Sequence, residues 1–307
     1  MSSAAEASRG HVLLTGSSGF TGAYVRAELE STGWRVTGLA HAPSQRPGER
    51  ELVVDLLDRH ALTDAVASVQ PTAVIHLAAI AHVAHEDVDA IYRCNVIGTR
   101  HLLEALAALP QVPARVILAS SANVYGNATV EPIGEDTPPA PANDYAVSKL
   151  AMEYLARLWF ERLPIVIVRP FNYTGVGQST AFLIPKIVDH FRRRAQSIAL
   201  GNLDVWREFQ DVRTIATCYR RLLEMDVTAG GVFNLCSGRA WSLREVLQMM
   251  AHIAGYRIEV RSDPGLVRAN EVRRLRGDPT RLARALGAGP AIALQDTLRW
   301  MYEAAAD

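Results

Sequence analysis

The chain has 307 residues, of which 49% are hydrophobic and 21% charged, a composition typical of a globular protein with a large core. No stretch approaches the roughly 20 consecutive apolar residues that a transmembrane helix requires. Its 32 Lys and Arg balance its 32 Asp and Glu, so no overall positive field would attract nucleic acid or an anionic membrane. We therefore expect a soluble protein without nucleic-acid or membrane partners, in which any anion is bound by local groups.

The three cysteines, Cys94, Cys218 and Cys236, are far apart and lack the spacing of metal ligands. We expect them to be reduced residues of the core, with no metal site, in a cytoplasmic protein. Residues 1–10 are small and polar and lack the apolar stretch of a signal peptide, which predicts a disordered tail.

Apolar runs rich in β-branched residues alternate with helical patterns in the first half of the chain. Such runs suit strands that are buried on both faces, and the helical segments are long enough to connect parallel strands. The predicted strands are 11–15, 34–39, 51–54, 72–77, 115–119 and 164–169, and the predicted helices are 24–31, 62–69, 90–109 and 145–162. The pattern predicts a doubly wound parallel α/β sheet of the Rossmann type.

The rhythm changes after residue 169. A glycine-rich loop, a basic helix around 182–194, a strand at 231–235, a helix from 243 and a final amphipathic helix follow. We predict a Rossmann domain over 1–170, to which 205–238 returns, and a smaller interleaved α/β region formed by 171–204 and 239–307.

A glycine-rich turn comes directly after the first predicted strand, with the sequence Gly16-Ser-Ser-Gly19-Phe-Thr-Gly22. Glycines at these positions permit a tight turn, let backbone N–H groups approach a pyrophosphate and let the next helix pack on the strand. The helix N-terminus favours negative charge. We predict a dinucleotide site that includes Gly16, Ser18, Gly19, Phe20, Thr21 and Gly22.

The segments after the next strands bear on which dinucleotide binds. An NAD enzyme usually has an acid at the end of the second strand to bond the ribose 2′-hydroxyl, but this chain has Leu39-Ala-His-Ala42. With His41 and Arg46 near a 2′-phosphate, NADP is favoured and NAD stays as the alternative. Further candidate cofactor contacts are Asp55 and Leu56 after the third strand, and Leu77, Ala78 and Ala79 after the fourth.

Tyr145 and Lys149 form a YxxxK motif at the start of a predicted helix, so that both project from one face about one turn apart. Ser121 follows the fifth predicted strand. A phenol with a pKa near 10 is a poor acid or base at neutral pH unless a neighbouring ammonium favours its phenolate. These three residues are the predicted catalytic set.

With these motifs the chain resembles a known family, the nucleotide-sugar epimerase and dehydratase group of extended short-chain dehydrogenases. The motifs that carry the resemblance are Gly16–Gly22, His76-Leu-Ala-Ala79, Ser120-Ser-Ala-Asn-Val-Tyr-Gly126, Tyr145-Ala-Val-Ser-Lys149 and Arg169-Pro-Phe-Asn172. The resemblance implies that Ser121 polarises a carbonyl or hydroxyl and that Tyr145 transfers the proton. It also implies that Asn95 holds a helix, that Asn172 binds a substrate phosphate or sugar, and that helices 90–109 and 145–162 form a homodimer.

The residues after Ser121 separate members of this group. Dehydratases of the group place an acid pair, or a Thr with a Glu, just after the catalytic Ser or Thr, where this chain has Ala122 and Asn123. An amide cannot act as a general acid or base, which argues against 4,6-dehydration. Ketone reduction and 4-epimerisation need no such acid, and Asn123 is a candidate substrate contact.

The C-terminal half is similar to GDP-6-deoxy-4-keto-mannose reductases. The similar segments are Leu200-Gly-Asn-Leu-Asp204, Arg207-Glu-Phe-Gln-Asp-Val212, Asn234-Leu-Cys-Ser-Gly238, Arg268-Ala-Asn-Glu-Val272 and Gly277-Asp278. The resemblance implies that 171–204 and 239–307 bind a nucleotide sugar. Arg207 and Arg268 would clamp its diphosphate. Asn202 and Glu271 would contact the base or ribose, and His82 and Arg239 would lie near the sugar.

The sequence therefore favours an NADPH-dependent reductase of the C4 ketone of a nucleotide-linked 4-keto-6-deoxyhexose, GDP-4-keto-6-deoxymannose above all. A dTDP-linked substrate, a 4-epimerase with tightly bound NAD and a cofactor-binding regulator without turnover are the alternatives.

Overall fold

The computed structural model describes residues 9–41, 50–81, 87–225, 230–263, 265, 274–287, 289 and 291–305. The chain divides into two compact units. The first consists of Met1–Val124, Pro141–Arg169 and Ala216–Phe233, and the second of Tyr125–Ala140, Pro170–Ile215 and Asn234–Asp307. Among the described helices, none is long and apolar enough to cross a bilayer.

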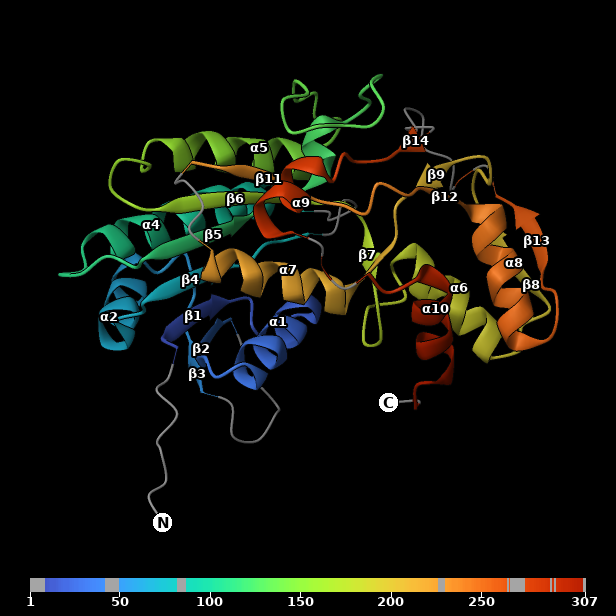
Figure 1. Ribbon diagram of the computed structural model, residues 1–307, viewed down its shortest axis with the longest axis horizontal. Coiled ribbons are helices and arrows are strands. Elements are labelled where there is room, and N and C mark those ends of the chain that lie inside the picture. The colour runs from blue at the N-terminus through green and yellow to red at the C-terminus, as the bar shows by residue number, and fades with distance from the viewer. Residues whose placement is uncertain are drawn as a thin grey trace, which may run out of the picture. The chain divides into compact units, whose positions relative to one another are not determined.

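A seven-stranded sheet forms the frame of the first unit (Figure 1). Its order is β11-β6-β5-β4-β1-β2-β3, and the pairs from β6 through β3 are parallel. The strands are β1 (His11–Thr15), β2 (Arg35–Ala40), β3 (Glu51–Val53), β4 (Ala73–His76), β5 (Arg115–Ala119), β6 (Ile165–Pro170) and β11 (Val232–Leu235). The order reverses between β1 and β4, so the predicted doubly wound fold is confirmed.

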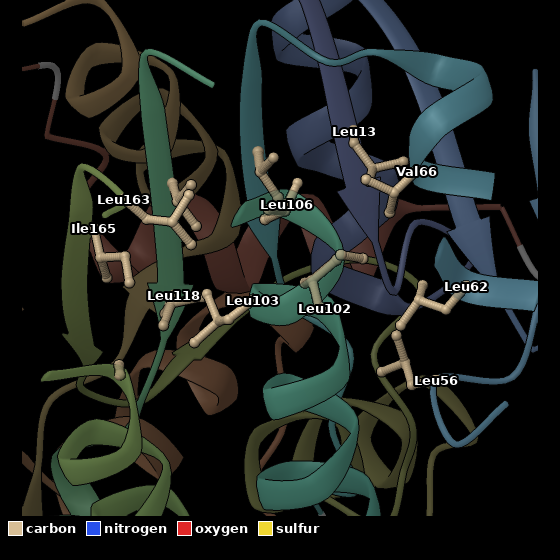
Figure 2. Close-up of a cluster of buried hydrophobic side chains, with 14 of the residues drawn as sticks. Leu13, Leu56, Leu62, Val66, Leu102, Leu103, Leu106, Leu118, Leu163 and Ile165 are labelled. Carbon is tan, nitrogen blue, oxygen red and sulfur yellow. The ribbon is translucent and has the colours of Figure 1, made fainter. Parts of the chain in front are cut away.

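The helices beside this sheet are α1 (Phe20–Ser31), α2 (Arg59–Val69), α3 (Val88–Tyr92), α4 (Thr99–Ala107), α5 (Asp144–Arg157) and α7 (Val212–Glu224). Alternate residues of each strand point to opposite faces. Leu13 and Leu118 thus face a core that α2, α4 and α5 complete, with Leu62, Leu102 and Leu103 among its members (Figure 2). Figure 1 shows α1 and α7 together on the other face, where Arg220 Nε lies 2.8 Å from Glu28.

The second unit is built around three helices, α6 (Leu183–Arg192), α8 (Leu243–Ala254) and α10 (Leu294–Glu303), whose apolar faces share one buried cluster. A capping box between Ser242 and Glu245 starts α8. The unit also contains α9 (Thr280–Leu286) and the short strands β7 (Tyr173–Thr174), β8 (Ser197–Leu200), β9 (Trp206–Arg207), β10 (Gln210–Asp211), β12 (Trp241–Ser242), β13 (Glu259–Ser262) and β14 (Arg274–Leu275). Strands β12, β9 and β14 form one small sheet.

All four helices predicted in the first half of the chain differ in their limits from the structure. α2 begins at Arg59 rather than at residue 62, and α5 ends at Arg157 rather than at residue 162. α1 begins at Phe20, inside the glycine motif rather than at residue 24. The helix expected over 90–109 is divided, because the π-helix η1 (Arg93–Gly98) lies between α3 and α4. A π-turn carries one more residue per hydrogen-bonded loop than an α-turn, and hydrophobic periodicity does not reveal it.

Candidate active site

The glycine turn lies between β1 and α1, at the carboxyl end of β1. Gly16 has φ +68°, and a Cβ atom there would lie 2.8 Å from the backbone N of Ala78. A Cβ at Gly22 would lie 2.2 Å from the carbonyl oxygen of Gly16. The N-cap of α1 is Gly19, which has no side chain, so the N-terminus of the helix has only backbone at this position. This close backbone turn at a helix N-terminus fits the pyrophosphate of a dinucleotide.

The remaining turn residues divide between solvent and interior. Ser18 and Gly19 are exposed, and Phe20 and Thr21 are half-buried in the first turn of α1. Ser17, which the sequence did not single out, is buried and donates a hydrogen bond to Glu51 of β3. No local spacing links these two residues, since the fold alone brings β3 beside the turn.

His76 joins the glycine turn to the segment after β4. Thr99 Oγ1 donates to Asn95 O at 2.7 Å and therefore accepts from His76 Nε2 at 2.9 Å, so His76 is the Nε2–H tautomer. Its Nδ1 accepts from Thr15 Oγ1 at 2.6 Å, and Thr15 in turn accepts from Ala78 N at 3.2 Å. Burial, with a smaller contribution from Lys149, lowers the pKa of His76 to about 3. A permanently neutral His76 thus fixes the Leu77–Ala79 segment beside the turn.

Asn95 connects that segment to α5. It lies in η1, is buried, and its side chain bonds to both N and O of Ile80 at 2.9 and 3.2 Å. Its Nδ2 also donates to Ser148 Oγ at 3.0 Å. Asn95 therefore holds α5 against the end of β4, which is consistent with the structural role that the resemblance implies.

Ser121 comes two residues after β5, at the same carboxyl edge of the sheet as the glycine turn. It is buried, and its Oγ accepts from Asn123 N at 3.1 Å at the start of the 3-10 helix η2 (Ala122–Tyr125). Asn123 itself is half-buried. The serine predicted as catalytic is thus held by the turn that follows it.

Tyr145 and Lys149 lie on the first two turns of α5, which Asn143 caps by accepting from Ala146 N at 2.9 Å. Both side chains are buried. Lys149 Nζ donates to Ala119 O at 2.8 Å, which brings the ammonium to the end of β5. Burial lowers the pKa of Lys149 to about 8, against the opposing effects of Cys94 and Glu153. Lys149 is therefore mostly protonated at neutral pH.

The other predicted cofactor contacts of the first unit differ in exposure. His41 is exposed just after β2, and Asp55 is exposed and accepts from Leu57 N at 2.9 Å. Leu56 is buried, and its carbonyl oxygen is 3.0 Å from His101 Nδ1. Arg46, His82, Arg268 and Glu271 lie outside the described residues. Among the residues described, no group of three or more His, Cys, Asp or Glu could hold a metal ion.

Four predicted substrate contacts lie in the second unit. Asn172 and Asn202 are exposed, and Asn202 Oδ1 accepts from Asp204 N at 2.9 Å. Arg207 is half-buried on β9, and the exposed Arg239 stacks on Trp241, 3.8 Å from the ring centroid.

A residue that the sequence did not single out, Glu208, supports the loops that carry these arginines. It is fully buried and accepts from Ser237 N and Gly277 N, both at 2.6 Å. Desolvation raises the pKa of Glu208 although these hydrogen bonds oppose it.

Known proteins are similar to this chain in sequence and fold. GDP-6-deoxy-D-mannose reductase from Pseudomonas aeruginosa is 35% identical over 94% of this chain and 94% of its own length. The structure of RMD from Pseudomonas aeruginosa complexed with NADPH is 34% identical, covers 95% of this chain and 97% of its own, and has a TM-score of 0.84. A protein from Burkholderia cenocepacia J2315, provisionally described as an epimerase, is 50% identical with a TM-score of 0.90 and the same coverage.

The model of the NAD dependent epimerase/dehydratase family matches residues 12–236, which include the glycine turn, Ser121, Tyr145 and Lys149. The chain belongs to the NAD-dependent epimerase/dehydratase family.

Proposed function

We propose that the protein is an NADPH-dependent oxidoreductase that reduces the C4 ketone of a nucleotide-linked 4-keto-6-deoxyhexose, with GDP-4-keto-6-deoxymannose as the favoured substrate. The observation that carries the proposal is the position of Lys149. Its ammonium bonds to Ala119 O, at the end of β5 and two residues before Ser121. Along α5, Lys149 is one helical turn from Tyr145. The glycine turn lies at the same edge of the sheet, where ligands of doubly wound folds bind.

The residues that would hold the dinucleotide come from the ends of β1, β2, β3 and β4. Gly16, Gly19 and Gly22 with Ser18, Phe20 and Thr21 would hold the pyrophosphate, and Leu77, Ala78 and Ala79 would line its path. When bound, the nicotinamide supplies the hydride. Because β2 ends at Ala40 without an acid that would repel a 2′-phosphate, we favour NADPH over NADH. His41 and Arg46 are the candidates to face that phosphate.

Ser121, Tyr145 and Lys149 would handle the proton and the ketone oxygen. Ser121 would donate a hydrogen bond to the oxygen, and Tyr145 would protonate it as it becomes a hydroxyl. Lys149 would stabilise the phenolate that remains. A donor placed in advance at a developing oxyanion contributes about 3 kcal/mol, so each of these groups has a measurable effect.

The second unit would bind the nucleotide sugar. Arg207, with Arg268, would hold the diphosphate, because guanidinium groups match the geometry of phosphate oxygens. Asn202 and Glu271 would contact the base or ribose, and Asn172, Asn123, His82 and Arg239 the sugar side. Asn123 has no proton to exchange at neutral pH, which favours reduction over dehydration.

The test follows NADPH absorbance while 4-keto-6-deoxyhexoses linked to GDP, dTDP or UDP are supplied in turn. We expect oxidation of NADPH with the GDP-linked ketone. Tyr145→Phe removes the proton donor and should reduce kcat at least about a hundredfold with an unchanged circular dichroism spectrum. An unaltered kcat in this variant would reject the mechanism.

A 4-epimerase is the second candidate, favoured by the description of the Burkholderia cenocepacia relative. An epimerase returns the hydride to the same substrate, so purified protein would contain NAD and consume no NADPH. Absorbance at 340 nm and mass spectrometry of the denatured protein's supernatant distinguish the two functions.

We also infer that the protein works as a homodimer in the cytoplasm. Large apolar side chains are exposed on α5 (Val147 and Tyr154), at its C-cap (Leu158) and on η1 (Ile97). Exposed apolar residues gathered on neighbouring elements are typical of an interface.

A further inference from the structure

Glu153 lies one helical turn beyond Lys149 on α5. Tyr145, Lys149 and Glu153 are spaced by four residues and therefore share one face of the helix. Glu153 is 0% exposed. Its Oε1 accepts from Ser120 Oγ at 2.5 Å and from Arg169 Nε at 2.8 Å, and its Oε2 accepts from Arg169 Nη2 at 2.6 Å. The carboxylate is thus enclosed directly behind the predicted catalytic residues.

Two buried cations, Lys149 and Arg169, lie in the same part of the core as the buried carboxylate of Glu153. Arg169, at the end of β6, is as deeply buried as Lys149, and it forms a bidentate ion pair with Glu153. The guanidinium of an arginine keeps its proton in proteins, whereas a buried lysine readily loses one. If the carboxylate charge were removed, Lys149 would lose the neighbouring negative charge that raises its pKa and Arg169 would lose its ion pair, and both changes favour deprotonation of Lys149.

Two further titratable groups near Lys149, His76 and Cys94, carry no negative charge at neutral pH. His76, from β4, is neutral because its pKa is about 3. Cys94, from η1, has a thiol whose pKa is raised by burial. Tyr145, on the same helix as Lys149, is the group on which the charge of Lys149 is proposed to act. Among the described residues that act on Lys149, Glu153 therefore supplies the negative charge at pH 7.

We propose that Glu153 is a positioning residue for the reaction: by neutralising Arg169 in the buried space behind the site, it keeps Lys149 as an ammonium. The inference rests on the proposed role of Lys149 toward Tyr145. Its test does not require turnover, because the charge on Lys149 can be observed in protein without dinucleotide.

The sequence contains two lysines, Lys149 and Lys186, so that selective ¹³C labelling of lysine gives two side-chain signals. Lys186, whose ammonium bonds to Ala199 O at 2.9 Å, serves as the internal reference. We expect Lys149 to titrate near pH 8 in the unmodified protein. Glu153→Gln should lower that midpoint by about one pH unit, a tenfold loss in proton affinity.

Arg169→Gln should move the midpoint in the opposite direction, because the charge of Glu153 would then act on Lys149 alone. Ser120→Ala removes a hydrogen bond to Glu153 without changing any charge, and should leave the midpoint near that of the unmodified protein. Shifts of the same sign in the Glu153 and Arg169 variants, or no shift in either, would overturn the proposal. If Glu153→Gln does not fold, the sign of the Arg169→Gln shift decides it.

The kinetic counterpart is the alkaline limb of kcat/KM, which should move with the Lys149 midpoint in each variant. Failure of the unmodified protein to oxidise NADPH with any nucleotide-linked ketone would reject the proposed function and leave the NMR result standing. Conversely, normal turnover with an unchanged Lys149 midpoint in Glu153→Gln would reject only the role of Glu153.

Discussion

Lys149 must satisfy two opposing conditions. In the proposed mechanism it has to be charged to stabilise a phenolate, yet it is buried, and burial disfavours the charge. The hydrogen bond from its Nζ to Ala119 O holds the ammonium at the end of β5. Because the pKa is lowered from about 10.5 to about 8, the ammonium is present below pH 8 and is lost as the pH rises through that value.

We therefore expect kcat/KM for ketone reduction to fall as the pH rises through about 8. The measurement is a pH–rate profile at limiting substrate, which reports groups of the free enzyme. Lys149→Met should abolish this limb together with most of the activity. A profile that stays level to pH 10 would mean that the charge on Lys149 is not required.

At the scale of residues, candidate site residues can be proposed from the sequence where their spacing places them on one face of a helix. Tyr145 and Lys149 came from a four-residue interval, and Glu153, one further interval along, could have been found by the same reasoning. The bond between Ser17 and Glu51 had no such signal, because it depends on how β3 packs beside the turn.

At the scale of elements, Gly22 in the glycine turn leaves no space for a side chain. A methyl group at Gly22 would collide with backbone atoms, at 2.2 Å from Gly16 O and 2.8 Å from Ser17 Cα, rather than with a movable side chain. The start of α1 can therefore take its place against the turn only if this position has no side chain.

Gly22→Ala should weaken dinucleotide binding at least about tenfold, which corresponds to about 1.4 kcal/mol, because the displaced turn no longer fits the pyrophosphate. Fluorescence titration with NADPH measures the Kd. Gly134→Ala is the matched control, since a Cβ there meets nothing within 4 Å. Equal affinities for the two variants would refute the assignment of the turn.

Strands were easier to predict than helix ends. β1 and β5 have the predicted limits because buried parallel strands are continuous apolar runs. α1 starts four residues early because glycine and threonine, poor helix formers, are held in helical conformation by the turn, which local propensity does not register.

At the scale of the whole molecule, the sequence predicted a second, interleaved region, and the structure has two units whose segments alternate along the chain. The limits of the substrate region stay a prediction. They depend on which residues contact the nucleotide sugar, and Arg268 and Glu271 are outside the described residues.

The proposed dimer is tested at Leu158, the C-cap residue of α5. Leu158 is 78% exposed and Tyr154 54% exposed, and a charge at Leu158 would have to be desolvated on association. We expect Leu158→Glu to convert the dimer to a monomer in sedimentation velocity. Val130→Glu, at another exposed apolar residue, should leave the dimer intact. If the unmodified protein sediments as a monomer, the inference of a dimer is wrong.

The π-helix η1 contains one extra residue relative to an α-helical turn. Each residue of an α-helix rotates by about 100°, so the extra residue offsets the side chains before η1 from those after it. That offset lets Asn95 reach Ile80 and Ser148 while Leu102 and Leu103 still face the sheet. Deleting one residue between Arg93 and Gly98 would restore a regular α-helix. Either the contacts of Asn95 or the packing of Leu102 and Leu103 would then be lost. The length of this segment is therefore a constraint, and a single substitution cannot supply the missing residue.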